Sequence, residues 1–140
     1  MDVFTPVKRS EIMRNIPSKN TKPELLMRRT LFALGLRYRL HDKKLIGRPD
    51  IVFRKSKVVV FVDGDWWHGR YYDQNHKKYT PFWQKKIKTN MERDIKVNTI
   101  LNAMGWKVFR IWQKDLEKEP VKYGRQIYEY VKSNKLDIIT

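Results

Sequence analysis

The order of hydrophobic and polar positions along the chain predicts a mixed α/β fold. Apolar residues recur at helical spacing over residues 21–35, 81–104 and 115–134. Short apolar or alternating runs, which are typical of strands, occupy residues 36–41, 49–53, 58–62 and 106–112. Because strands and helices are interleaved in this order, we expect a central mixed β-sheet flanked by helices.

The first predicted helix has clear start and stop signals. Thr21 stands at the N-cap, Pro23 lies in the first turn, and Glu24 completes a capping box. Gly35 follows as a natural C-terminal stop. Glu24 therefore has two open interpretations: it caps its own helix, or it brings a carboxylate to an active site.

A predicted hairpin gathers the most reactive side chains. The strands at residues 49–53 and 58–62 are joined by a short turn and should pair in antiparallel fashion. Asp50 begins the first strand and Asp63 ends the second, so we expect the two carboxylates to meet. The valine-rich second strand leads directly into the run Asp-Gly-Asp-Trp-Trp-His at residues 63–68. A buried strand that ends in such a cluster is a common way to build an active site.

Three polar residues interrupt the apolar face of the long predicted helix, namely Asn90, Asp94 and Asn98. An unpaired buried carboxylate is costly, so Asp94 needs a partner. Two interpretations are open: Asp94 forms a salt bridge in the core, or it points into a functional site.

Charge dominates the composition. The chain has 31 Lys and Arg against 15 Asp and Glu, a formal net charge of +16, which favours binding to a polyanion. Basic and aromatic residues interleave over residues 71–80, which favours a nucleic-acid surface, although a solvated loop is the other open interpretation. The basic residues that we predict to contact DNA are Arg48, Arg70, Lys77 and Lys78.

Composition also excludes several classes. The chain has no cysteine, hence no disulfide or thiolate metal site, and no apolar run near the ~20 residues that cross a bilayer. The start of the chain does not resemble a signal peptide, so we expect a cytoplasmic protein with no membrane partner. With 140 residues, we expect a flexible basic arm over residues 1–20 and a single nuclease domain over residues 21–140.

These residues suit the hydrolysis of a phosphodiester with Mg²⁺, which prefers oxygen ligands. The predicted ligands are Asp50, Asp63 and the backbone carbonyl of Val62. A zinc site is not expected, because His68 and His76 have no cysteine beside them.

An imidazole titrates near working pH, so His68 is the natural proton carrier. In this scheme Asp94 orients the imidazole and Glu24 holds a water molecule near the metal. The five predicted catalytic residues are Asp50, His68, Glu24, Asp94 and Asp63.

Four motifs together resemble the very-short-patch mismatch-repair (Vsr-like) endonucleases. They are GRPDIVF at residues 47–53, VVVFVDGDWWHG at 58–69, FWQKKIKTNMERD at 82–94 and LNAMGWKVFRIW at 101–112. The resemblance extends from about residue 9 to residue 112. It implies the restriction-endonuclease-like fold and a Mg²⁺-dependent nick in DNA, at a T:G mismatch in the repair enzymes.

The resemblance also implies roles for single residues. Asp50 and the carbonyl of Val62 match the metal-binding positions, and His68 matches the catalytic base. Glu24 and Asp94 match the family's acidic residues. Trp66 and Trp67 match aromatic residues that wedge into the base stack, although packing in the core is the other open interpretation.

The sequence departs from the family pattern at two places. Arg70, Tyr72 and Gln113 stand where the repair enzymes hold a structural zinc, so we expect no zinc here, with Tyr71, Tyr72 and Trp112 packing in its place. Asp63 stands where a histidine is usual, which leaves mismatch specificity open.

Two alternatives therefore remain. One is a site-specific homing or restriction-associated endonuclease of the same fold, and the other is a catalytically inactive DNA-binding module. For the favoured repair enzyme we expect a monomer that binds double-stranded DNA in a bacterial or phage nucleoid, with DNA-repair proteins as possible partners.

Overall fold

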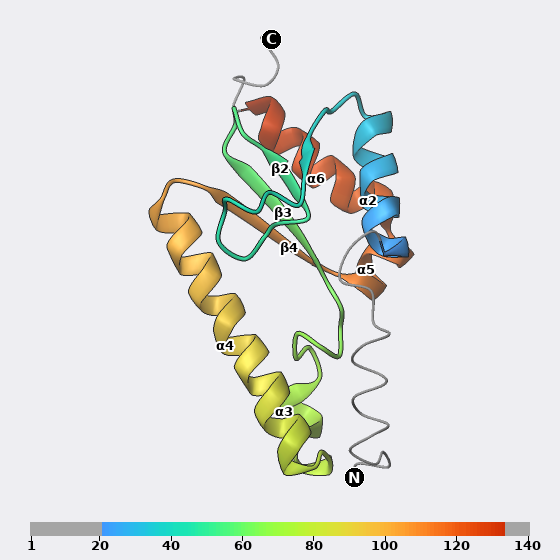
Figure 1. Cartoon of the computed structure of the whole chain (residues 1–140). Helices are drawn as coiled ribbons and strands as arrows, with labels where there is room; N and C mark the ends of the chain where they lie inside the picture. Colours follow the sequence, from blue (N-terminus) through green and yellow to red (C-terminus); the bar gives the residue numbers. More distant parts are fainter. Residues whose placement is uncertain (1–20, 134–140) are drawn as a thin grey trace.

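The computed structural model describes residues 21–133 as a mixed sheet with helices on both faces (Figure 1). The helices are α2 (Lys22–Ala33), α3 (Tyr72–Asn75), α4 (Pro81–Ala103), α5 (Gln113–Lys118) and α6 (Pro120–Ser133), with a 3₁₀ turn η1 (His76–Lys78) after α3. The strands are β1 (Arg39–Leu40), β2 (Ile51–Phe53), β3 (Val58–Asp63) and β4 (Lys107–Trp112). The predicted fold class is confirmed, whereas the predicted arm over residues 1–20 lies outside the described residues.

The sheet has the strand order β1-β2-β3-β4. β1, β2 and β3 pair in antiparallel fashion, and β3 pairs with β4 in parallel fashion through the crossover that contains α4. The predicted hairpin is confirmed: Ile51 pairs with Val60, and the amide of Asp50 donates to the carbonyl of Val60 at 3.0 Å. β3 therefore runs through the interior of the sheet and extends past the end of β2.

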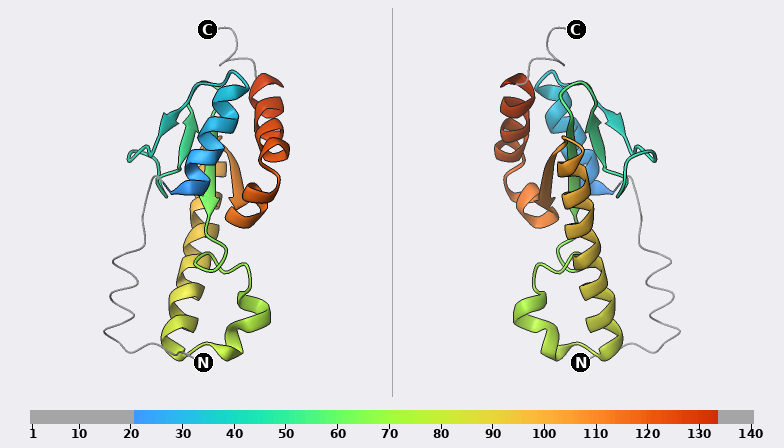
Figure 2. Two further views of the ribbon diagram at one scale, coloured as in Figure 1. Left: turned by 90° about the vertical axis from the view of Figure 1, so that its right-hand side faces the viewer. Right: turned by 90° about the vertical axis from the view of Figure 1, so that its left-hand side faces the viewer.

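The valine run of β3 is apolar on both sides because both faces of the sheet are covered. Val58 and Val60 pack toward α2 and α6, where Met27, Leu31 and Ile127 are buried. On the other face, Val59 and Phe61 pack against Val97 and Leu101 of α4 with Trp106. The views of Figure 2 show α4 on one side of the sheet and α2 with α6 on the other.

Helix α2 begins as the sequence predicts. Thr21 has extended backbone angles, and its side chain accepts a hydrogen bond from the amide of Glu24 at 3.4 Å. The helix ends at Ala33, and Gly35 follows with φ of 90°. The N-terminal turn of α2 thereby places Glu24, which is 5% exposed, beside the end of the hairpin.

Two expected segments differ from the structure, and a third agrees with it. The strand expected over residues 36–41 shrinks to the edge strand β1, because His41 takes a left-handed φ of 45° directly after Leu40. The loop expected over residues 71–80 contains α3 and η1, where the rings of Tyr72 and His76 stack one helical turn apart at 5.0 Å. The C-terminal helix is divided into α5 and α6 at Pro120, as the sequence predicts, because proline cannot donate a backbone hydrogen bond.

Among the described residues, no helix is long and apolar enough to span a membrane.

Two glycine substitutions should separate backbone strain from overpacking. A Cβ at Gly47, where φ is 79°, would lie 2.6 Å from Cγ1 of Val97 and 3.3 Å from the ring of Phe61. Gly35 also has a positive φ, but a Cβ there meets no atom within 4 Å. We expect Gly47→Ala to lower the free energy of unfolding by about 1–3 kcal/mol more than Gly35→Ala does.

Urea denaturation of the two variants measures this difference. Equal losses at both positions would show that the contact with Val97 relaxes without cost.

Candidate active site

Two groups of acidic and histidine side chains lie at the C-terminal end of β3. One group consists of Glu24, His41 and Asp50, and the other consists of Asp63, His68 and Asp94. Within each group the potential ligand atoms lie within 4.8 Å of one another. Glu24 comes from α2 and Asp94 from α4, so helices on opposite faces of the sheet supply one acid each.

Asp50 is fixed where β3 extends past β2. Its Oδ2 accepts a hydrogen bond of 2.7 Å from the amide of Val62. Burial and, to a lesser extent, the nearby carboxylates of Glu24 and Asp63 raise the pKa of Asp50, and the hydrogen bond from the Val62 amide lowers it; the net result is a pKa of about 7. The carboxylates of Asp50 and Glu24 therefore lie close together at this strand end.

The Val62 peptide is oriented toward Asp50. Backbone groups alternate along a strand, so Val62 directs its amide and carbonyl to the same edge as Val60, whose carbonyl accepts from the Asp50 amide. β2 pairs with this edge of β3 only as far as Ile51, which lies opposite Val60. The predicted oxygen donors Asp50 and Val62 thus lie together, as cation coordination requires.

His68 is braced by Asp94. The His68 Nδ1 lies 2.6 Å from Oδ2 of Asp94 and 3.8 Å from Oδ1 of Asp63, and the side chain is 26% exposed. Burial lowers the pKa of His68, but the hydrogen bond to Asp94 and the charges of Asp63 and Asp94 outweigh it, so the pKa is raised overall. With Nδ1 engaged by Asp94, Nε2 is the ring nitrogen that faces other partners.

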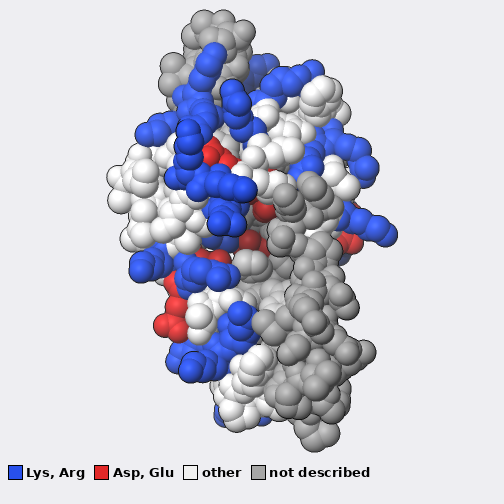
Figure 3. All heavy atoms as spheres, viewed as in Figure 1, with Lys and Arg blue, Asp and Glu red and all other residues white. Residues whose placement is uncertain are grey.

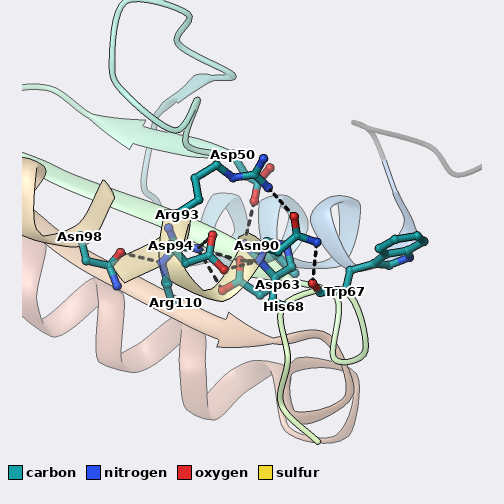
Figure 4. A network of polar contacts seen from close by, with 10 residues as sticks. Asp50, Asp63, Trp67, His68, Asn90, Arg93, Asp94, Asn98 and Arg110 are labelled. Carbon is teal, nitrogen blue, oxygen red and sulfur yellow. Dashed lines mark hydrogen bonds and ion pairs between the residues drawn. The ribbon is translucent and has the colours of Figure 1, made fainter. Parts of the chain in front are cut away.

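Asp63 is held by an arginine that the sequence analysis did not select. Arg110 of β4 donates through Nη1 to both carboxylate oxygens of Asp63, at 3.0 and 3.1 Å. Nη1 of Arg110 also lies 3.5 Å from Asp94, and its Nε donates to Asn98 at 2.6 Å (Figure 4). Burial still raises the pKa of Asp63, against the opposing charges of His68 and Arg110.

The polar residues within the apolar face of α4 therefore all have partners at this site. Asp94 binds His68, Asn98 binds Arg110, and the Asn90 side chain donates to the carbonyl of Trp67 at 3.0 Å. A cavity of about 310 Å³ opens beside His68. Its lining residues are Asp63, His68, Gly69, Arg70, Met91, Asp94, Ile95, Arg110 and Trp112.

The two predicted wedge residues differ in exposure. Trp66 is 36% exposed, whereas Trp67 is half-buried. Both pack edge-to-face on the buried Trp83, with centroid distances of 5.0 and 5.8 Å. Trp66 is thus a partly exposed ring that packs on Trp83, whereas Trp67 is mostly part of the packed interior.

The predicted DNA contacts also differ in their surroundings. Arg48, Lys77 and Lys78 are exposed. On the face shown in Figure 3, Lys and Arg atoms cover much of the surface, and Asp and Glu atoms appear in small patches between them. A polyanion on this face would meet basic side chains around an acidic centre.

Arg70, in contrast, forms ion pairs with acidic residues of the protein itself. Its Nη1 lies 2.8 Å from Oδ2 of Asp65 and 2.9 Å from Oδ1 of Asp115, and Asp65 also accepts from the Lys114 amide at 3.0 Å. These bonds tie the loop that carries His68 to the start of α5. The sequence-based expectation that this place holds no structural zinc stays a prediction.

Two residues of the site were missed from the sequence. Arg110 was hidden in an alternating strand, and only the parallel register that places it beside Phe61 reveals it. His41 stands at the end of the short alternating strand that the sequence predicts over residues 36–41. The feature that points to His41 is the antiparallel pairing of β1 with β2, because this register brings the end of β1 beside Asp50.

A mixed sheet with paired carboxylates at one strand end and an acid-braced imidazole beside them defines the class as a restriction-endonuclease-like nuclease. Comparison with known proteins gives the family. Residues 1–74 match the family model described as DNA mismatch endonuclease Vsr. The chain belongs to this family of DNA endonucleases, which confirms the resemblance and the enzyme class predicted from the sequence.

Similar proteins are bacterial. The type II nicking enzyme V.HpaIIP of Haemophilus parainfluenzae is 43% identical over 135 residues, which cover 94% of this chain and 96% of the relative. V.NmeAIP of Neisseria meningitidis, also a type II nicking enzyme, is 47% identical over 86% of this chain and 87% of its own. The DNA mismatch endonuclease Vsr of Escherichia coli K12 is 35% identical, over 80% of this chain and 73% of the relative.

Neutralising Asp50 should stabilise the metal-free protein. With a folded pKa of about 7 against an ordinary 3.8, the ionised carboxylate destabilises the fold increasingly as pH rises between these values. We expect Asp50→Asn, which keeps an acceptor for Val62, to raise the free energy of unfolding at pH 8 by on the order of 2–4 kcal/mol. The gain should shrink below pH 7 and vanish near pH 4, as measured by urea denaturation in EDTA. A gain that grows toward low pH would contradict this assignment.

Removing the Asp94 charge should lower the pKa of His68. Burial is the largest effect on this pKa and lowers it, whereas the hydrogen bond to the ionised Asp94 and the charge of Asp94 raise it, so removing the charge shifts the balance toward burial. An NMR titration of the His68 ring in Asp94→Asn should therefore show a lower midpoint than in the parent protein. Glu129→Gln, an equal charge change on the exposed face of α6, is the control and should leave the midpoint unchanged.

Proposed function

We propose that this chain is a Mg²⁺-dependent endonuclease that nicks one strand of double-stranded DNA beside a T:G mismatch. The observation that carries the proposal is the placement of the Asp50 and Glu24 carboxylates at one side of the β3 end and the His68–Asp94 pair at the other. Family membership supports the DNA substrate.

The donor set fits a hard divalent cation. Asp50 and Val62 would hold the metal directly, and Glu24 lies close enough to Asp50 to share it. Two crowded carboxylates, one with its pKa raised to about 7, are a place where a cation relieves repulsion. When bound, Mg²⁺ would supply charge stabilisation at the scissile phosphate.

The protein's own groups then divide the remaining work. His68 accepts the proton of the attacking water through Nε2, because Asp94 holds Nδ1 at 2.6 Å. Arg110 neutralises Asp63 and keeps the charge beside His68 fixed. Asp63 is retained as a candidate ligand and catalytic acid, although its bonds to Arg110 favour a role in orienting the site.

DNA is bound by the basic and aromatic surface. The supported ring of Trp66 suits insertion beside a mispaired base, and Arg48, Lys77 and Lys78 suit phosphate contacts. The E. coli relative is named a DNA mismatch endonuclease, which supports a mismatch as the target. We propose a monomer that acts on the DNA of a bacterial nucleoid.

A second candidate function is nicking associated with a restriction system. Relatives such as V.HpaIIP are named type II nicking enzymes, which favours this role for the same chemistry. The two candidates differ in how the substrate is chosen rather than in how the strand is cut.

A cleavage assay on labelled duplexes tests the proposal. We expect a single nick in a T:G duplex with Mg²⁺, none with EDTA, and none in the matched duplex. His68→Ala should lower the rate by about 100-fold or more, the range typical of a general base, whereas Glu129→Gln should not.

Each alternative predicts a different outcome. Equal nicking of both duplexes would favour the restriction-associated role. Binding without any cleavage, in Mg²⁺ or Mn²⁺, would overturn the enzyme and leave a DNA-binding module.

A further inference from the structure

His41 lies near the end of β3 but has no role in the mechanism proposed above. Its Nε2 lies 3.0 Å from Oε2 of Glu24, a carboxylate that is 5% exposed. The His41 side chain is itself only 22% exposed. This is a short, largely buried contact between α2 and the end of β1, far apart in the sequence.

The backbone at His41 supports a specific placement. The residue has φ of 45°, a left-handed conformation that non-glycine residues adopt only where the surroundings impose it. Its amide donates to the carbonyl of Asp50 at 3.3 Å. One residue thus contacts both carboxylate-bearing residues of the proposed metal site, Asp50 by its backbone and Glu24 by its ring.

The proton arrangement follows from the neighbours. An ionised Glu24 only accepts hydrogen bonds and Arg28 only donates them, so the 3.0 Å contact requires a proton on Nε2 of His41. Nη2 of Arg28 lies 3.5 Å from this nitrogen and 3.3 Å from Glu24. A cation bound to Nε2 would lie against the guanidinium, which argues against metal ligation through this nitrogen of His41.

We propose that His41 is a positioning residue that holds Glu24 in the metal site, as the Val62 amide holds Asp50. Both carboxylates then have a hydrogen-bond donor that fixes their orientation. Loss of such an outer partner typically weakens metal binding by about 10–100-fold. This inference rests on the proposed function, because it assigns His41 to the site that the function requires.

The test compares substitutions that keep or remove the donor. His41→Gln retains an N–H that can reach Glu24, and His41→Leu does not. Mn²⁺ binding to the full chain is followed by the electron paramagnetic resonance signal of free Mn²⁺, without DNA. We expect the Kd for Mn²⁺ to rise about tenfold or more in His41→Leu and to stay within about threefold of the parent value in His41→Gln.

A loss of folding is separated from a loss of positioning. His41→Asn tolerates a left-handed backbone but is too short to reach Glu24, so it should weaken Mn²⁺ binding while thermal unfolding remains cooperative. Nicking by each variant at rising Mg²⁺ should show a larger Mg²⁺ requirement for His41→Leu and His41→Asn, with the rate partly recovered at high Mg²⁺.

The outcomes distinguish this inference from the proposed function. Equal Mn²⁺ affinity in all variants, equal losses in His41→Gln and His41→Leu, or no binding by the parent protein would overturn the role of His41. If the parent protein cuts no DNA but Mn²⁺ binding follows the predicted order, the proposed function fails and the positioning role stands.

Discussion

The burial of β3 on both faces is the constraint on which the site depends. Val58 and Val60 fill one core and Val59 and Phe61 fill the other, so the strand cannot slip by one residue without exchanging the two sets. Because the register is fixed in this way, the strand end is fixed too. Asp63 and the loop that carries His68 therefore emerge at one place, where α2 and α4 approach from opposite sides.

At this place the two groups of acids have different surroundings. Arg110 donates to both carboxylate oxygens of Asp63 and lies 3.5 Å from Asp94. On the other side, Arg28 pairs with Glu24, whereas burial and the neighbouring carboxylates raise the pKa of Asp50 to about 7. The destabilised Asp50 carboxylate has a reason to bind a cation, whereas the acids beside Arg110 are suited to orienting an imidazole. The two groups are therefore not interchangeable, although their residue types are similar.

Much of this arrangement could be predicted from the sequence, because local signals agree with the fold. The cap at Thr21, the hairpin and the apolar stripe of α4 are each set by neighbouring residues, and together they placed Asp50 beside Val62 and Asp94 on the buried face of its helix. His41 and Arg110 could not be found in this way. Their roles come from pairing between strands, β1 with β2 and β3 with β4, and a strand pattern does not say which neighbour a side chain will face. The α3 and η1 turns were missed for a related reason, because basic and polar residues carry little periodicity.

Arg110 also explains why an aspartate can occupy position 63, next to a histidine and a second acid. An unpaired carboxylate there would add charge repulsion to a site that already disfavours the ionised form of Asp50, because the charge of Asp63 contributes to the raised pKa of Asp50. The parallel register places Phe61 beside Arg110, and the guanidinium lies 3.9 Å from the Phe61 ring centroid, which holds it over the strand end. The same guanidinium reaches Asp63, Asp94 and Asn98, so one cation from β4 links the acid that ends β3 to the helix that orients His68. A substitution at either position 63 or position 110 alone would leave a buried charge without its partner, and such uncompensated charges are costly. Asp63 and Arg110 therefore act as a unit, and this unit, rather than Asp63 alone, acts together with Asp94 on the electrostatic surroundings of the imidazole.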